Sequence, residues 1–286
     1  MPIYKGWFFE KKIPGKRERG IRHGFLIEEI IFKKKKRDRE FLIFKNPIYG
    51  KVLVINGILQ LTEFDEYIYH EMISHSALFP HPNPKKILII GGGDGGALRE
   101  VLKHKIDKVE LVETNEEIIK LAKTFLKFVS QNAFSDKRVK VFIKRGEDFL
   151  EKKEKEYDVI IVDCLNIGES DSLPLVKLKF YQRAFTALKN KGIFITLGAS
   201  FLDFERFIKK IFLELKKVFP KVFVLRFCIP SFHCGEYSFL VASKGIDLKK
   251  VKIEKKFEEF EKKPSLKYFS PEIFKANLTL PKNFRL

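Results

Sequence analysis

Cysteine is scarce in this sequence, and long apolar runs are absent. Among 286 residues there are three cysteines, Cys164, Cys228 and Cys234, whose irregular spacing does not fit a disulfide framework or a zinc site of paired C-x-x-C motifs. We therefore expect packed thiols and no metal. No apolar stretch approaches the ~18–20 residues that a membrane span needs, and the beginning MPIYKGWFFEKK lacks the apolar core of a signal peptide. The expected location is the cytoplasm, away from membranes.

Lysine and phenylalanine, in contrast, are abundant. Hydrophobic residues make up 45% of the chain, enough for a globular core, and 17 glycines and 12 prolines are too few for a collagen-like or low-complexity protein. Lys and Arg (56) outnumber Asp and Glu (37), which gives a net charge of +19. Such a charge attracts nucleic acid, but a surplus of Lys and Glu is also typical of thermophilic proteins with many surface ion pairs. We favour a thermophile's surface and do not expect a nucleic-acid partner.

Residues 1–63 predict a small antiparallel β domain. Apolar runs alternate with turn signals between residues 25 and 62, and Asn56-Gly57 between two such runs is a strong hairpin signal. The basic run at residues 33–37 lies between two predicted strands, where either a solvated hairpin tip or a nucleic-acid patch is possible. We take it as a hairpin tip.

Residues 64–286 predict an α/β domain of the Rossmann-like, class I methyltransferase type. A helix is expected over 65–79 and another over 116–129, and short apolar strands alternate with helices of this kind. This alternation predicts a mostly parallel sheet that is covered on both faces and ends in an antiparallel edge pair. We expect the charged tail from residue 249 to pack loosely. The main parallel strands are KILII, KVELVE, VKVFI and DVIIVD.

Polar residues follow the predicted strands at the edge of the sheet where ligands bind. The first strand leads into the glycine turn 91–96, whose glycines let the backbone approach a ligand at a helix N-terminus. Glu113 ends the next strand, 20 residues after Gly93, a separation that suits an acid that binds ribose hydroxyls. Together they favour a nucleoside ligand. Asp94 would repel a pyrophosphate but suits an amine, and Asp163 ends a strand on the same rim, so two carboxylates converge on one pocket.

The chain resembles the spermidine synthases, a family of polyamine aminopropyltransferases. The resemblance spans the region from the β domain to about residue 244. It is carried by the segments NGILQLTEFDEYIYHEMISH, HPNPKKILIIGGGDGGALREVLKH, YDVIIVD and CIPSFHCG. It implies transfer of an aminopropyl group from decarboxylated S-adenosylmethionine, as co-substrate, to a primary amine such as putrescine. The products would be spermidine and methylthioadenosine. It also implies no metal, no prosthetic group, and a homodimer or homotetramer formed through the β domain, which would double as a substrate lid.

The resemblance also implies roles for individual residues. Asp163 would be the general base, Glu113 would hold the ribose, and Asp94 would bind the aminopropyl ammonium. The other residues implied to bind the donor are Gln60, Gly91, Gly93, Arg145 and Gly146. The other residues implied to bind the acceptor amine are Tyr69, His70, Asn166 and Phe232. The physics agrees, because a sulfonium and a protonated amine repel each other unless the pocket is acidic.

Four positions depart from the family pattern. Asn166 replaces the second aspartate of an Asp-x-x-Asp-Pro motif, which removes one amine-binding charge. Arg145 stands where the family has an aspartate that accepts the adenine amino group, although arginine has no acceptor. Arg39 replaces a glutamine and Phe232 a tyrosine. The predicted gate loop at 166–175 also differs, so the amine is left open.

Two alternatives remain open. One is an S-adenosylmethionine-dependent methyltransferase on the same fold, against which Asp94 and the segment YHEM argue. The other is a non-catalytic or altered-ligand relative of spermidine synthase, in which Arg145 and Asn166 record lost selection.

Overall fold

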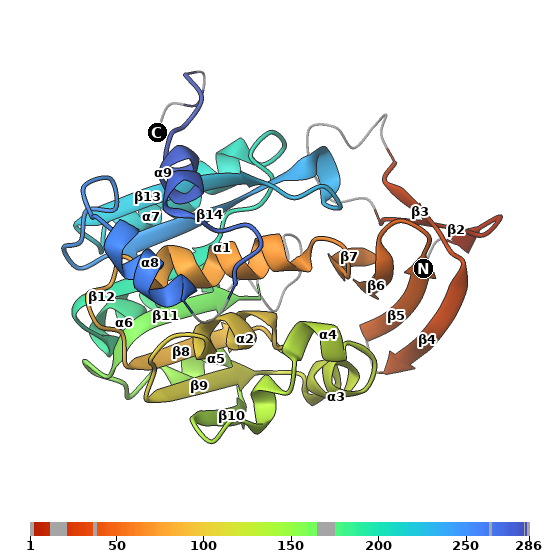
Figure 1. Ribbon diagram of the computed structural model, residues 1–286, viewed down its shortest axis with the longest axis horizontal. Coiled ribbons are helices and arrows are strands. Elements are labelled where there is room, and N and C mark those ends of the chain that lie inside the picture. Colours follow the sequence, from red (N-terminus) through yellow and green to blue (C-terminus); the bar gives the residue numbers. More distant parts are fainter. Residues whose placement is uncertain are drawn as a thin grey trace.

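The computed structural model describes residues 3–11, 22–36, 39–164, 175–262, 265–282 and 284. Asn166, a predicted site residue, and nearly all of the predicted gate loop at 166–175 lie outside these ranges. Figure 1 shows two small sheets beside a larger helix-covered sheet, and α1 (Glu66–Leu78) runs from the end of the four-stranded small sheet across the larger one.

The N-terminal part contains a four-stranded antiparallel sheet and a smaller three-stranded one. The four strands pair in sequence order, and the hairpin expected at Asn56-Gly57 joins the last two, with both residues at positive φ. These strands are β4 (Glu29–Lys36), β5 (Arg39–Asn46), β6 (Gly50–Ile55) and β7 (Ile58–Thr62), and the smaller sheet holds β1 (Ile3–Tyr4), β2 (Trp7–Phe9) and β3 (Gly24–Leu26).

The prediction that the basic run forms a hairpin tip is wrong for four of its five residues. Strand β4 continues through Lys36, which pairs with Arg39 on β5. Successive side chains of a strand point to opposite faces, so Lys34 and Lys36 share one face. Both donate to the carboxylate of Glu117 on α3 (Glu116–Phe125), each at 2.7 Å. The run therefore joins the N-terminal sheet to the neighbouring helix.

The central sheet has seven strands in the order β10-β9-β8-β11-β12-β14-β13. The first five of these run parallel, and β14 pairs antiparallel with both β12 and β13, which confirms the predicted α/β fold. Six consecutive residues of β11 are buried, as expected for a strand covered on both faces. The strands are β8 (Lys86–Gly91), β9 (Lys108–Glu113), β10 (Val139–Ile143), β11 (Tyr157–Asp163), β12 (Leu188–Leu197), β13 (Lys221–Cys228) and β14 (Glu236–Ser243).

The predicted helix over 116–129 is two helices. The chain turns at Leu126, where α3 ends and α4 (Lys127–Ser130) begins. This turn places Leu126 and Val129 in a buried cluster with Phe41 and Leu53 of the N-terminal sheet. Further helices of this domain are α2 (Gly96–Leu102), α5 (Gly146–Phe149), α6 (Leu178–Ala187) and α7 (Glu205–Lys216).

The expectation of a loosely packed tail is wrong. The tail forms α8 (Glu254–Glu261) and α9 (Pro271–Asn277), and Phe257, Phe269 and Phe274 are buried in the main core. The Glu71 carboxylate of α1 accepts hydrogen bonds from the backbone N–H groups of residues 267–269 at 2.8–2.9 Å. The segment is highly charged, but the phenylalanines interleaved among its charges supply a buried apolar face.

No helix in the described part of the chain is long and apolar enough to cross a membrane.

Candidate active site

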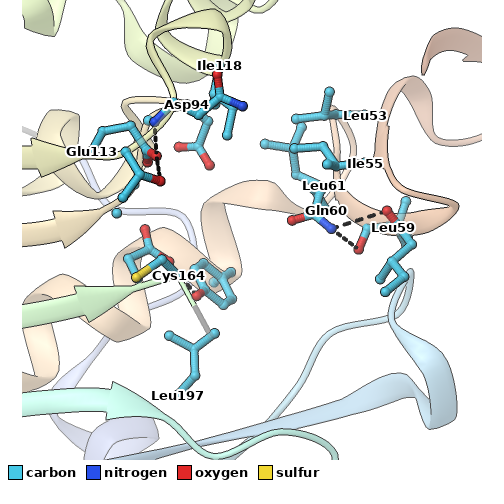
Figure 2. Close-up of a pocket in the computed structure, with 18 of the residues that line it drawn as sticks. Leu53, Ile55, Leu59, Gln60, Leu61, Asp94, Glu113, Ile118, Cys164 and Leu197 are labelled. Atoms are coloured by element: carbon cyan, nitrogen blue, oxygen red, sulfur yellow. Dashed lines mark hydrogen bonds between the residues drawn. The ribbon is translucent and has the colours of Figure 1, made fainter. Parts of the chain in front are cut away.

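A cavity of about 780 Å³ lies between the N-terminal sheet and the carboxyl ends of the central strands. Figure 2 shows Leu53, Ile55 and Gln60 on one side of it and Asp94 and Glu113 on the other. All the predicted site residues within the described ranges line this cavity. Strand-end side chains from β8, β9 and β11 meet here because parallel strands end at one edge of a sheet.

The glycine turn brings the backbone of β8 against the end of β11. Gly91 pairs with Asp163 in the sheet, and Gly92 N–H donates to the Asp163 carbonyl at 3.0 Å. A Cβ at position 91, where φ is +84°, would lie 2.3 Å from Cβ of Cys164, so only glycine fits. Asp94 follows in this turn and accepts a hydrogen bond from Gly96 N–H at 2.7 Å.

Asp163 presents one occupied and one open oxygen. The Tyr69 hydroxyl on α1 donates to Oδ1 of Asp163 at 2.5 Å. The other oxygen, Oδ2, is buried without a hydrogen-bond partner among the described residues. Burial, and then the nearby charge of Asp94, raise the pKa of Asp163 to about 6. The carboxyl is thus a proton acceptor tuned close to neutrality, with a lone pair available.

His70 is clamped between two carboxylates. Its Nδ1 lies 2.5 Å from Glu66 Oε2, and its Nε2 lies 3.4 Å from Asp94 Oδ1. Burial opposes the charged ring, but the carboxylates of Asp94 and Glu66 raise the pKa of His70 to about 10. His70 is therefore an imidazolium at neutral pH, and its charge lowers the pKa of Asp94 despite that residue's burial.

Glu66 in turn binds Arg99, so the charges form a chain that leads away from the cavity. Arg99 of α2 donates to both carboxylate oxygens of Glu66 at 2.8 and 3.1 Å and, through Nε, to Glu100 at 2.6 Å. The Glu100 carboxylate also meets the buried His75 ring at 3.0 Å. Alternating charges in a buried chain hold one another in place, and removing one member leaves its neighbours uncompensated.

Close helix packing makes this chain possible. A Cβ at position 96, the first residue of α2, would lie 2.3 Å from the His70 ring. Gly96 therefore lets α2 approach α1 closely enough for Arg99 to reach Glu66.

Glu113 stands at the end of β9, as predicted, with its side chain fixed by local donors. It accepts hydrogen bonds from Asn115 N–H at 2.8 Å and from the Thr114 hydroxyl at 3.2 Å (Figure 2). Burial raises its pKa, although these donors oppose the shift. The carboxylate faces the glycine turn, since a Cβ at Gly93 would lie 3.0 Å from its Oε2.

The remaining predicted residues lie around the cavity at different depths. Gln60 donates from its amide to the carbonyl of Ile58 at 3.2 Å, and Phe232 packs near Tyr69 with ring centroids 6.1 Å apart. Arg145 is half exposed and forms an ion pair with Glu147 two residues later. Arg39 lines the cavity too and lowers the pKa of Glu113 through its charge. Gly146 begins α5 against Ile90 of β8.

Sequence reasoning missed Glu66 and Arg99. One signal was available for the first of them, because Glu66 and His70 are four residues apart and so share one face of a helix. Arg99 is 33 residues away from Glu66, and no local pattern indicates their contact.

Comparisons with known proteins agree over both parts of the chain. Residues 66–253 match the family model described as the spermine/spermidine synthase domain, and residues 6–63 match that of the spermidine synthase tetramerisation domain. A polyamine aminopropyltransferase of Thermotoga maritima is 40% identical over 241 residues, which cover 84% of this chain and 80% of that protein. One from Clostridium tetani is 35% identical over 260 residues, 90% of each chain.

Solved structures agree as well. A spermidine synthase in complex with the transition-state analogue AdoDATO superimposes with a TM-score of 0.90 at 34% identity, covering 98% of this chain and 94% of the other. Spermidine synthase from Thermotoga maritima gives a TM-score of 0.88 at the same identity and coverage.

Proposed function

The chain belongs to the spermine/spermidine synthase family, and from this premise we propose how its cavity performs aminopropyl transfer. The enzyme is a polyamine aminopropyltransferase that uses decarboxylated S-adenosylmethionine and a primary amine, without a prosthetic group. The observation that carries the assignment of roles is the pairing of Asp94 and Asp163 in one cavity, one held ionised by His70 and the other with a raised pKa and an open oxygen.

Asp163 acts as the general base. Its carboxylate takes a proton from the ammonium of the acceptor, and the freed nitrogen lone pair attacks the methylene carbon next to the sulfonium. A C–N bond forms, the C–S bond breaks, and its electron pair stays on sulfur in the neutral leaving group, methylthioadenosine. The Tyr69 hydroxyl on Oδ1 fixes the carboxylate, which leaves Oδ2 for the amine.

Asp94 binds the terminal ammonium of the donor's aminopropyl group. Its ionised carboxylate lies in the turn that also approaches Glu113, which we assign to the ribose hydroxyls. A carboxylate at this position attracts a donor that carries only an ammonium and repels one that also carries a carboxylate. This preference disfavours a methyltransferase, whose donor keeps its carboxylate.

The acceptor amine is assigned to the part of the cavity lined by Tyr69, His70 and Phe232. Tyr69 and Phe232 supply apolar ring surface for a methylene chain, with their rings in contact with Tyr237. We keep Asn166 as a proposed amine contact on sequence alone, since it lies outside the described residues.

We assign residues 1–63 to oligomerisation and to a lid over the cavity, and residues 64–286 to catalysis. The match to a tetramerisation domain supports a homodimer or homotetramer. So does the concentration of exposed apolar side chains in or next to this part, namely Tyr4, Trp7, Leu26, Ile30, Ile48 and Phe64. We further propose a cytoplasmic, thermophilic enzyme. Light scattering coupled to size exclusion measures the oligomer, and a monomer would contradict the assignment.

The reaction is tested with purified chain, decarboxylated S-adenosylmethionine and a panel of diamines and polyamines at elevated temperature. Mass spectrometry follows methylthioadenosine and the extended amine, and the Asp163→Asn variant is the control. We expect a product with at least one amine, none in the variant, and none when the donor retains its carboxylate. Absence of product with every amine from folded protein would overturn aminopropyl transfer in favour of a non-catalytic relative, and transfer of a methyl group would favour the methyltransferase.

A further inference from the structure

Three potential metal ligands meet beside the cavity, outside the proposed reaction machinery. Asp203 Oδ2 lies 3.0 Å from His233 Nε2 and 3.0 Å from Cys234 Sγ. One ligand atom from each of the three residues lies within 4.8 Å of the others. The Asp203 side chain is only 2% exposed, whereas the His233 side chain is 27% exposed and lines the cavity.

Two segments that are 30 residues apart supply these side chains, and Glu236 connects the two segments. Asp203 lies between β12 and α7, and His233 and Cys234 lie in the short helix η3 (His233–Gly235) between β13 and β14. The Glu236 carboxylate accepts from Leu202 N–H at 2.7 Å and from Arg226 Nε at 2.7 Å, and its backbone continues from the η3 turn. The ligands are thus held together before any ion arrives.

The η3 turn aims both of its ligands at Asp203. Cys234 has a left-handed backbone, with φ at +67°, and hydrogen bonds from Ile229 N–H to Gly235 and from Gly235 N–H to Phe232 close the turn. Neighbouring residues of an extended chain point to opposite sides, so this backbone is what allows His233 and Cys234 to share one target.

We propose that Asp203, His233 and Cys234 form a three-ligand site for a zinc-class transition-metal ion. Thiolate, imidazole and carboxylate are a donor set that suits zinc, whereas magnesium and calcium take oxygen ligands almost exclusively. Ligand atoms around a tetrahedral zinc ion lie about 3.3–3.6 Å apart. The two 3.0 Å pairs need a small outward shift to admit the ion, and the third pair, His233 with Cys234, lies within 4.8 Å.

Three protein ligands leave a fourth position open on zinc, and among the three residues His233 lines the cavity. A second carboxylate–imidazole pair lies nearby, since the His23 ring centroid is 6.2 Å from that of His233 and His23 Nδ1 is 3.0 Å from Glu10. This pair belongs to the N-terminal part of the chain.

The competing explanation is a purely hydrogen-bonded cluster, in which His233 and the Cys234 thiol both donate to Asp203. The two differ in one measurable respect, because a metal site requires a thiolate–metal bond. The proposal concerns ion binding alone and stands or falls independently of aminopropyl transfer.

The test is a Co²⁺ titration of the full-length protein, without a polyhistidine tag and after removal of bound metal. Cobalt replaces zinc and reports a thiolate ligand through a near-ultraviolet charge-transfer band. We expect one equivalent to bind, with the band abolished in Cys234→Ser and retained in Cys228→Ser, the matched control with an exposed cysteine six residues away. His233→Asn and Asp203→Asn should each weaken binding at least about 100-fold, since loss of even an outer-shell partner costs 10–100-fold.

Zn²⁺ should displace the cobalt and abolish the band, and far-ultraviolet circular dichroism checks that each variant is folded. Any of three results would overturn the proposal. The first is the absence of the band at saturating Co²⁺, and the second is a band that survives Cys234→Ser. The third is an affinity for Co²⁺ in the His233→Asn and Asp203→Asn variants that equals the affinity of the wild type.

Discussion

The cavity has two ends of opposite construction. At the inner end, Asp94 begins a chain of charges that continues through His70 and Glu66 to Arg99, and its charge also acts on Asp163. At the outer end, the Arg145 side chain is 50% exposed and pairs with Glu147, a neighbour in its own segment. Contacts between residues far apart in the sequence, such as those of Tyr69 with Asp163 and of Arg99 with Glu66, help to position the inner groups, whereas Arg145 pairs with a residue two positions away.

This difference bears on Arg145, one of the positions where a departure from the family pattern is predicted from the sequence. Arg145, which the resemblance marks as a departure, lies at the outer end, and its hydrogen bonds to Glu147 do not involve the inner chain. Exposed side chains can reorient at little cost in free energy, but replacing a buried charge leaves its partner charges buried and uncompensated. We therefore predict that a change at Arg145 alters donor affinity more than the chemistry of the inner end.

The largest effect should follow from Asp163→Asn. An amide cannot accept the ammonium proton, so kcat should fall by about 10²–10⁴-fold, the usual contribution of a positioned base. Rapid-quench or mass-spectrometric turnover with saturating substrates measures this loss. A kcat within threefold of wild type would remove Asp163 from the role of base and break the proposed distinction between the two ends.

The same substitution should stabilise the fold. The pKa of Asp163 is raised from 3.8 to about 6 in the folded protein, so ionisation above that pH costs folding free energy, and below about pH 3.8 both states are protonated and the cost vanishes. At pH 8 the Asn variant should gain about 1–3 kcal/mol in the free energy of unfolding. The gain should shrink towards pH 4, and denaturant titrations at both pH values check this sign.

Glu66→Gln tests the inner chain one step away from the substrates. The change leaves His70 and Arg99 without their shared carboxylate, so we expect a loss of about 3–5 kcal/mol in unfolding free energy. The exposed Glu151→Gln, which breaks the ion pair with Arg183, is the control and should be nearly neutral.

Glu66 should act on catalysis only through His70. With one carboxylate fewer, the pKa of His70 falls and Asp94 loses part of its counter-charge, so the alkaline limit of activity should move to lower pH. NMR titration of the His70 ring and the pH profile of kcat/KM measure this shift. A purely structural role for Glu66 would lower stability and leave the alkaline limit in place.

The sequence predicted those site residues that lie within a few positions of the motif that indicates them. The strand-end rule placed Glu113 and Asp163, and the glycine turn placed Asp94, because each signal lies within a few residues of the side chain it predicts. The links from Glu66 to Arg99 and from Asp203 to Cys234 join residues about 30 apart through packing alone. The same holds for the phenylalanines of the tail and for the turn at Leu126, whose partners lie in other elements.

The decline of kcat/KM on the acid side of its pH profile should depend on the ionisation of Asp163 at the inner end. Since the base must be ionised, kcat/KM should fall about tenfold per pH unit below the pKa of Asp163, near 6. Raising ionic strength should move this limit little, because the pair that sets it is buried and poorly screened. A decline that lies near pH 4 would mean that Asp163 is solvated like an ordinary aspartate, which would contradict the buried geometry.

The smallest effect is expected at the outer end, from Arg145→Asp. A carboxylate there would provide an acceptor for the adenine amino group, and at this half-exposed position, where solvent screens the charge, we expect the hydrogen bond to contribute about 0.5–1.5 kcal/mol. The KM for the donor should therefore fall about two- to tenfold while kcat stays within twofold.

The Glu147 carboxylate loses its ion pair in this variant and would repel the new aspartate. The double variant Arg145→Asp with Glu147→Gln should therefore show a larger fall in the KM for the donor. Lys144→Asp, next in sequence and outside the cavity lining, is the matched control and should change neither constant. A large fall in kcat with Arg145→Asp would show that the arginine acts on the reacting groups, and the two ends of the cavity would then have to be treated as one.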